Sequence, residues 1–146
     1  VALAEFEEFG TKYAQDIVAN AKVLASSLAA EGFDVLAEER GFTASHQVLT
    51  RHGGIDSGAG RKAASILEDA GIITNMNMLP GDTKAMSPSG LRLGVQELTR
   101  HGMGVNEMEE VAECFRRVLI DNEDPGKVKE RVNSIRSDFQ EVKYCY

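Results

Sequence analysis

The segment SGLRLGV places an arginine where it could bind an acid. If this segment is a β-strand, its two-residue period turns Arg92 and Gly94 away from the apolar face. That apolar face carries Leu91, Leu93 and Val95. Because glycine has no side chain, the pattern predicts open space beside the guanidinium for a carboxylate held by two hydrogen bonds. An arginine that only faces solvent from a strand is the alternative that the spacing leaves open.

A second set of polar side chains occurs in the segment ITNMNMLPGD. Ile73, Asn75 and Asn77 share one face if a strand continues that far. Asparagine is a poor strand residue, and its amide can both donate and accept hydrogen bonds to a ligand. A fraying strand end, whose amides satisfy the backbone of the following loop, explains the same pattern.

The remaining reactive residue types give no complete catalytic pattern. His46 is a ligand-facing group or a strand residue at the domain edge, and the sequence favours no metal site. We identify no Ser/His/Asp order, paired-carboxylate motif or phosphate-binding loop. Cys114 and Cys145 are expected to be reduced, structural residues.

Hydrophobic spacing predicts the elements that carry these residues. A long amphipathic helix begins the chain and ends near Gly32, and two strands, FDVLA and HQVLT, follow it and pair in antiparallel fashion. A helix over 61–70, the strands IITNMN and LRLGV, and two final helices complete the order. The first helix is expected to bury a stripe of large side chains: Phe6, Phe9, Tyr13, Ile17, Leu24 and Leu28.

Capping signals predict where the two final helices begin. Asn106, with Glu109 three residues later, resembles a capping box, and Asp124 with Pro125 predicts the start of the last helix. The apolar stripe of that last helix is expected to run as Val128, Val132, Ile135, Phe139 and Val142. Together the elements predict an α+β fold, in which helices pack against a small, mostly antiparallel sheet as an α/β sandwich.

Composition restricts the class of protein. The chain has 146 residues, which fits one domain, and 42% of them are hydrophobic. A net charge of −7 predicts no general affinity for nucleic acid or for an anionic membrane. No apolar run approaches the roughly 20 residues that span a bilayer. The start also lacks the basic and apolar regions of a signal peptide, so we expect a cytoplasmic protein. Because the chain starts at Val1 inside a helix-like segment with no capping residue before it, we expect a piece of a longer chain.

Several segments together resemble a known family. ITNMNMLP, SGLRLG and LTRHGMG occur in this order and are followed by NEMEEVAECFRRVL. This combination resembles the C-terminal half of serine hydroxymethyltransferases. The upstream segments YAQDIVANAKVLASSLAAEGF and SHQVL resemble the family too, so the similarity covers nearly the whole chain.

The resemblance implies a fold-type-I pyridoxal-phosphate enzyme that works as a homodimer. Such an enzyme interconverts serine and glycine and transfers a one-carbon unit to a reduced pteridine. Arg92 matches the family arginine that binds the amino-acid carboxylate, and Asn77 matches an asparagine associated with pteridine recognition. Met76 stands where many members have lysine, so the resemblance implies either tetrahydrofolate or a modified pterin as the carrier.

By the same resemblance, residues 1–146 are the C-terminal small domain of the enzyme. The Schiff-base lysine is then expected upstream, no catalytic residue is assigned here, and the isolated chain is expected to fold without activity. Two alternatives stay open. One is the small domain of another fold-type-I enzyme, an aminotransferase or a threonine aldolase, and the other is a stand-alone amino-acid-binding module.

Overall fold

The computed structural model describes residues 2–146 and shows an α+β fold, as the sequence predicts. Four strands form one sheet in the order β1-β2-β4-β3, and every neighbouring pair is antiparallel. The elements are α1 (Ala2–Ala30), β1 (Asp34–Val35), the 3₁₀ helix η1 (Glu38–Arg40), β2 (Gln47–Arg51), α2 (Ala59–Asp69), β3 (Asn75–Asn77), β4 (Gly90–Gly94), α3 (Gln96–Arg100), α4 (Val105–Leu119) and α5 (Pro125–Ser137).

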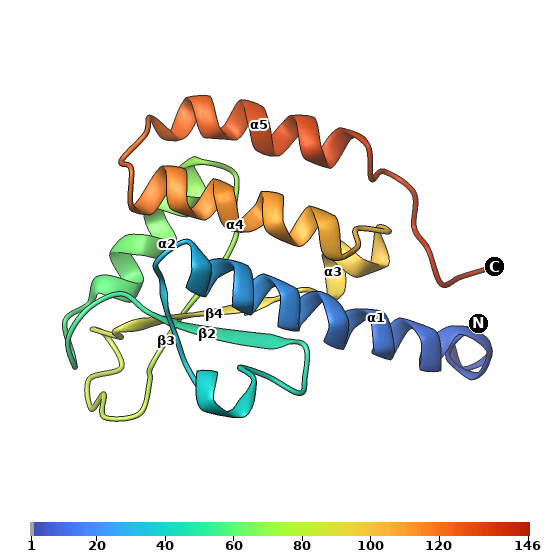
Figure 1. Cartoon of the computed structure of the whole chain (residues 1–146), viewed down its shortest axis with the longest axis horizontal. Helices are drawn as coiled ribbons and strands as arrows, with labels where there is room; N and C mark the ends of the chain where they lie inside the picture. Colours follow the sequence, from blue (N-terminus) through green and yellow to red (C-terminus); the bar gives the residue numbers. More distant parts are fainter. Residues whose placement is uncertain (1) are drawn as a thin grey trace.

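The core lies between one face of the sheet and the helices. In Figure 1, α1 and α4 lie on one side of the sheet, and α5 packs on α4 farther from the strands. The strands alternate between buried and more exposed residues, as expected for a sheet covered on one face. The largest side chains of the core come from all layers: Leu24, Leu28, Val48, Leu67, Leu91, Leu93, Met108, Phe115 and Val128.

Helix α1 buries only its second half. Leu24 and Leu28 are 3% and 0% exposed, whereas Phe6 is 68% exposed, so the predicted stripe is wrong at its N-terminal end. The reason is visible in Figure 1, where the first turns of α1 extend beyond the sheet. The buried amide of Asn20 donates hydrogen bonds of 2.9 Å to the Thr99 hydroxyl and to the Met103 carbonyl. These bonds attach α1 to α3 and to the turn after it.

Helix α3 was not predicted from the sequence. It has five residues, which is too short for a helical hydrophobic period to be recognised. It begins one residue after β4, and the Thr99 hydroxyl donates to the Val95 carbonyl at 2.8 Å. The sequence pattern therefore predicts the strand but not the short helix that follows it.

The starts of the last two helices test the capping predictions. Asp124 caps α5 as predicted, and its side chain accepts a hydrogen bond of 3.2 Å from the Lys127 amide. The Asn106 prediction is wrong, because α4 begins at Val105 and its N-cap is Gly104. There the Glu107 carboxylate accepts from the Gly104 amide at 2.6 Å, so an acid outside the predicted pair satisfies the backbone.

The C-terminal residues of the predicted α5 stripe lie outside the helix. Val128 and Ile135 are buried as predicted, but α5 ends at Ser137. Phe139 packs against the core from the segment after the helix, and Val142 is 50% exposed. Within residues 2–146, no helix combines the length and the apolar character needed to cross a membrane.

Candidate functional site

Arg92 lies near the centre of the open face of the sheet. Its two cross-strand neighbours are Leu49 on β2 and Asn75 on β3, so all three side chains point to the same side. Arg92 is exposed, whereas Leu91 and Leu93 beside it are 0% and 4% exposed. The predicted facing of this strand is therefore confirmed. Among residues 2–146, Arg92 has no salt bridge, so its guanidinium is available to an external acid.

One side chain from α3 lies close to Gly94, the glycine next to Arg92 on this face. A Cβ atom on Gly94 would lie 2.5 Å from the side-chain oxygen of Gln96. The side-chain amide of Gln96 therefore lies beside Gly94. Gly94 itself is exposed, so the open space beside the guanidinium stays a prediction. Gln96 gives the surface a neutral group that can donate and accept hydrogen bonds.

The asparagines of β3 share the open face with Arg92. Asn75 stands directly opposite Arg92, and Asn77 stands opposite Gly90, two pairs farther along the strand. The Asn77 amide nitrogen donates to the Met78 carbonyl at 2.6 Å, which is the local backbone bond that strand fraying predicts. Ile73 lies before the strand and is 82% exposed, so the predicted strand is shorter than the IITNMN segment.

The loop between β3 and β4 is fixed by one acid that the sequence did not single out. The Asp82 carboxylate accepts from the amides of Leu79 and Ser89, each at 2.9 Å, and from the Ser89 hydroxyl at 2.8 Å. Its other oxygen accepts from the Asp56 amide at 2.8 Å. These hydrogen bonds to backbone amides hold the pKa of Asp82 far below its usual range. An aspartate in a Pro-Gly-Asp turn was the only local signal for this role.

Asp56 also binds the loop between β3 and β4. Its carboxylate accepts from the Thr83 hydroxyl at 2.6 Å and from the amides of Thr83 and Lys84 at 2.8 Å. The Thr83 hydroxyl bond is the main cause that lowers the pKa of Asp56. Asp56 and Asp82 thus join the segment before α2 to the segment before β4. We call this pair of aspartates the aspartate brace.

The brace places the loop against the start of β4. Leu79 is 3% exposed, and its side chain lies 2.5 Å from where a Cβ of Gly90 would be. On the other side, the first turn of α2 brings Gly60 against the Gly90 carbonyl. Neither glycine position has room for a side chain. The loop, the first turn of α2 and the start of β4 therefore pack closely together.

The histidines contribute less to the open face. His46 is half-buried just before β2, and its carbonyl accepts from the Val95 amide at 3.4 Å. His52 packs edge-on against Phe33, with ring centroids 6.0 Å apart, and lies 2.8 Å from the Thr50 hydroxyl. Burial lowers the pKa of His52, so its neutral form is favoured. Residues 2–146 contain no group of three His, Cys, Asp or Glu side chains placed to hold a metal ion.

The whole chain is similar to proteins of known family. The family model for serine hydroxymethyltransferase matches residues 1–115. Serine hydroxymethyltransferases from Thermoplasma acidophilum and Methanopyrus kandleri are each 51% identical over the full chain. The chain spans only 34% of the length of each of these relatives.

A solved structure supports the same similarity at the level of the fold. The L-threonine transaldolase from Pseudomonas fluorescens, in its internal aldimine state, superimposes with a TM-score of 0.88 at 34% identity. The match covers 99% of this chain and 32% of the transaldolase chain. The open face with Arg92 therefore belongs to a unit that recurs as about a third of larger proteins.

Proposed function

This chain belongs to the serine hydroxymethyltransferase family, and we propose from this premise that it is the substrate-binding, C-terminal small domain of such an enzyme. The proposed whole enzyme interconverts serine and glycine and transfers the one-carbon unit to a reduced pteridine. It acts in the cytoplasm as a homodimer. The isolated 146-residue chain is then one part of the catalytic unit and has no turnover of its own.

The free guanidinium of Arg92 carries the proposal. It stands on the open face of the sheet without a carboxylate partner within residues 2–146, between the side chains of Leu49 and Asn75. A planar guanidinium binds a carboxylate through two parallel hydrogen bonds, which fixes the direction of the bound amino acid as well as its affinity. In the proposed enzyme, Arg92 therefore holds the substrate carboxylate and orients the bond that is broken.

The pteridine carrier is proposed to approach from the β3 side of Arg92. Asn77 lies on the same face as Arg92, and its amide oxygen can accept a hydrogen bond while the nitrogen is bonded to Met78. Met76 is 44% exposed and gives this edge an apolar group in place of a cation. The carrier is tetrahydrofolate or a modified pterin.

The cofactor of the proposed enzyme is pyridoxal phosphate, which supplies electron withdrawal from the bound amino acid. Residues 2–146 fit the substrate side of such a site but not the cofactor itself. Every lysine in them is exposed, and none belongs to the strands that carry Arg92 and its neighbours. We propose that the lysine that binds the cofactor lies in the part of the family's length that this chain does not span.

A second candidate follows from the structural similarity to the L-threonine transaldolase. An enzyme of that kind, or the threonine aldolase expected as an alternative, could use Arg92 in the same way. The relatives named serine hydroxymethyltransferase are 51% identical to this chain, against 34% for the transaldolase, which favours the first proposal.

Two preparations test the proposal. The enzyme that contains this chain should form glycine from serine at a rate that depends on added tetrahydrofolate or pterin. The isolated chain should give a cooperative thermal transition but no glycine when pyridoxal phosphate and serine are added. Turnover of threonine without turnover of serine in the larger enzyme would replace this proposal by the second candidate. Turnover by the isolated chain would refute its assignment as a substrate-binding part.

A further inference from the structure

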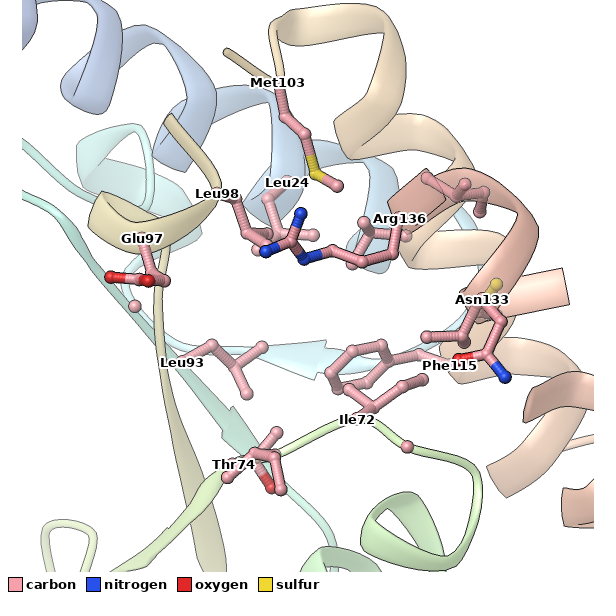
Figure 2. A pocket seen from close by; sticks show the side chains of 17 residues that line it. Leu24, Ile72, Thr74, Leu93, Glu97, Leu98, Met103, Phe115, Asn133 and Arg136 are labelled. Carbon is pink, nitrogen blue, oxygen red and sulfur yellow. The ribbon is translucent and has the colours of Figure 1, made fainter. Parts of the chain in front are cut away.

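A pocket lies on the helix-covered side of the sheet, bordered by Gly94 but not by Arg92. It has a volume of about 470 Å³ and is enclosed by α3, α4, α5 and the segment 71–74 (Figure 2). Cavities of this size are typical of small-molecule sites, in which apolar walls surround a few polar groups. The walls are mostly apolar and include Ile72, Leu93, Leu98, Met103, Phe115 and Ile135.

One cation lies within these apolar walls. Figure 2 shows the guanidinium of Arg136 extending from α5 toward Leu98 and Leu24. Its side chain donates to the Phe139 carbonyl, and within residues 2–146 it has no salt bridge. A guanidinium that is partly removed from water without an anion retains unused donors in a setting where a carboxylate would bind strongly.

The other arginines of α4 and α5 show what is unusual about Arg136. Arg117 lies 2.7 Å from Glu123, Arg116 lies 2.8 Å from Glu31, and Arg131 is paired with Glu110. Each of these guanidinium groups has a carboxylate of the chain as its partner. Arg136, which alone among them lines the pocket, has none in the described residues.

Apart from Arg136 and from Glu97 at the border, the polar groups that line the pocket are neutral. The Thr74 hydroxyl is buried without a hydrogen-bond partner in residues 2–146. Burial raises the pKa of the Cys114 thiol, so this wall is neutral. Glu97 also borders the pocket, but its side chain is 85% exposed and lies 3.4 Å from the His101 ring. The pocket therefore offers an apolar volume with the guanidinium of Arg136, the free hydroxyl of Thr74 and the neutral amide of Asn133.

We propose that this pocket is a binding site for a small amphipathic monocarboxylate. Its apolar chain or ring would lie along Phe115, Leu93 and Ile72, and its carboxylate would bind the guanidinium of Arg136. A strongly charged phosphate fits less well, because a single arginine faces it among apolar walls. This site is separate from the one that contains Arg92, so the inference does not depend on the proposed function.

Octanoate and octanol are matched probes, since they share the apolar chain and differ in charge. Titration of the 146-residue chain by calorimetry should show saturable octanoate binding and at least tenfold weaker octanol binding. Arg136→Gln should weaken octanoate at least tenfold and leave octanol unchanged. Arg131→Gln, which removes an arginine of the same helix outside the pocket, should have no effect.

A further variant and the amide chemical shifts of two lining residues test the same site. Glu97→Gln should tighten octanoate binding, because it removes a negative charge from the pocket rim. Amide chemical shifts of Ile72 and Phe115 should move on titration with octanoate, and Arg136→Lys should retain part of the binding if Arg136→Gln fails to fold. The proposal is overturned if octanoate does not saturate, if octanol binds equally well, or if both Arg136 variants bind octanoate like the unchanged chain.

Discussion

The phenolic hydroxyl of Tyr13 on α1 donates a hydrogen bond of 2.9 Å to the backbone carbonyl of Gln96, the first residue of α3. The side chain of the same Gln96 lies beside Gly94, two positions from Arg92 on the open face. Tyr144 of the C-terminal segment stacks on Tyr13 with ring centroids 4.8 Å apart. The N-terminal helix and the C-terminal segment together therefore hold the turn that follows β4.

Removal of the Tyr13 hydroxyl should loosen this turn. Tyr13→Phe deletes one hydrogen bond to a backbone carbonyl, so the free energy of unfolding should fall by about 1 kcal/mol. Urea unfolding of the isolated chain measures this change. Tyr146→Phe is the control, because Tyr146 is 76% exposed and its hydroxyl bonds to the side chain of Glu8 at the surface, where the loss should change stability little. Equal stability of the two variants would show that the Tyr13 bond to Gln96 contributes nothing.

Arg92→Lys in the enzyme that contains this chain should damage serine binding and turnover without loss of the fold. Lysine keeps the positive charge but loses the planar pair of donors, and a misplaced substrate reacts more slowly. Arg92→Ala should be worse in both respects. Because Arg92 is exposed on the open face, the thermal midpoint of each variant should stay close to that of the unchanged protein.

The serine kinetics and the thermal midpoint are measured for each Arg92 variant. Arg61→Lys is a matched control, since Arg61 is an exposed arginine on α2, away from the open face. Normal serine kinetics in Arg92→Lys would remove Arg92 from the substrate site. A large fall in the thermal midpoint would instead make it a structural residue.

Asn77→Ala should raise the Michaelis constant for the pteridine carrier more than that for serine. Loss of a hydrogen bond to a buried ligand edge costs about 1 to 3 kcal/mol, which corresponds to roughly five- to 150-fold in the carrier constant. Asn106→Ala is the control, because Asn106 is an exposed asparagine of α4 that does not cap the helix. An effect confined to serine would assign Asn77 to the amino-acid side of the site.

Asp82→Asn should weaken the aspartate brace in a way that depends on pH. The folded protein lowers the pKa of Asp82, so its contribution to stability is fully present above the ordinary aspartate value of about 3.9. That contribution is lost as the pH falls toward the lower pKa of the folded state. The stability difference between the unchanged chain and Asp82→Asn should therefore be largest near neutral pH and shrink below about pH 4.

Unfolding in urea at several pH values between neutral and acid measures this difference. Glu39→Gln changes an exposed acid outside the brace and should leave stability near that of the unchanged chain at neutral pH. If Asp82→Asn is as stable as the unchanged chain at neutral pH, the hydrogen bonds of Asp82 do not brace the loop.

The sequence by itself determined the features that depend on neighbours along the chain. The alternation of strand residues turned Arg92 away from Leu91 and Leu93, and the structure confirms it. Asp124 was identified as a helix cap because its side chain reaches only three residues ahead. The order of the four strands and the longer helices, the mostly antiparallel sheet and the family resemblance also followed from patterns of this kind, whereas α3 did not.

The tertiary structure decided the features that join distant segments. Asp56 and Asp82 lie 26 residues apart, and no local period relates them, so only the fold brings the Asp82 carboxylate to the Asp56 amide and the Asp56 carboxylate to the amides of Thr83 and Lys84. The same holds for the contact of Tyr13 with Gln96, 83 positions away, and for the pocket around Arg136. Whether the missing side chain of Gly94 leaves space also depends on what packs there, and only the fold shows that the Gln96 side chain lies near it.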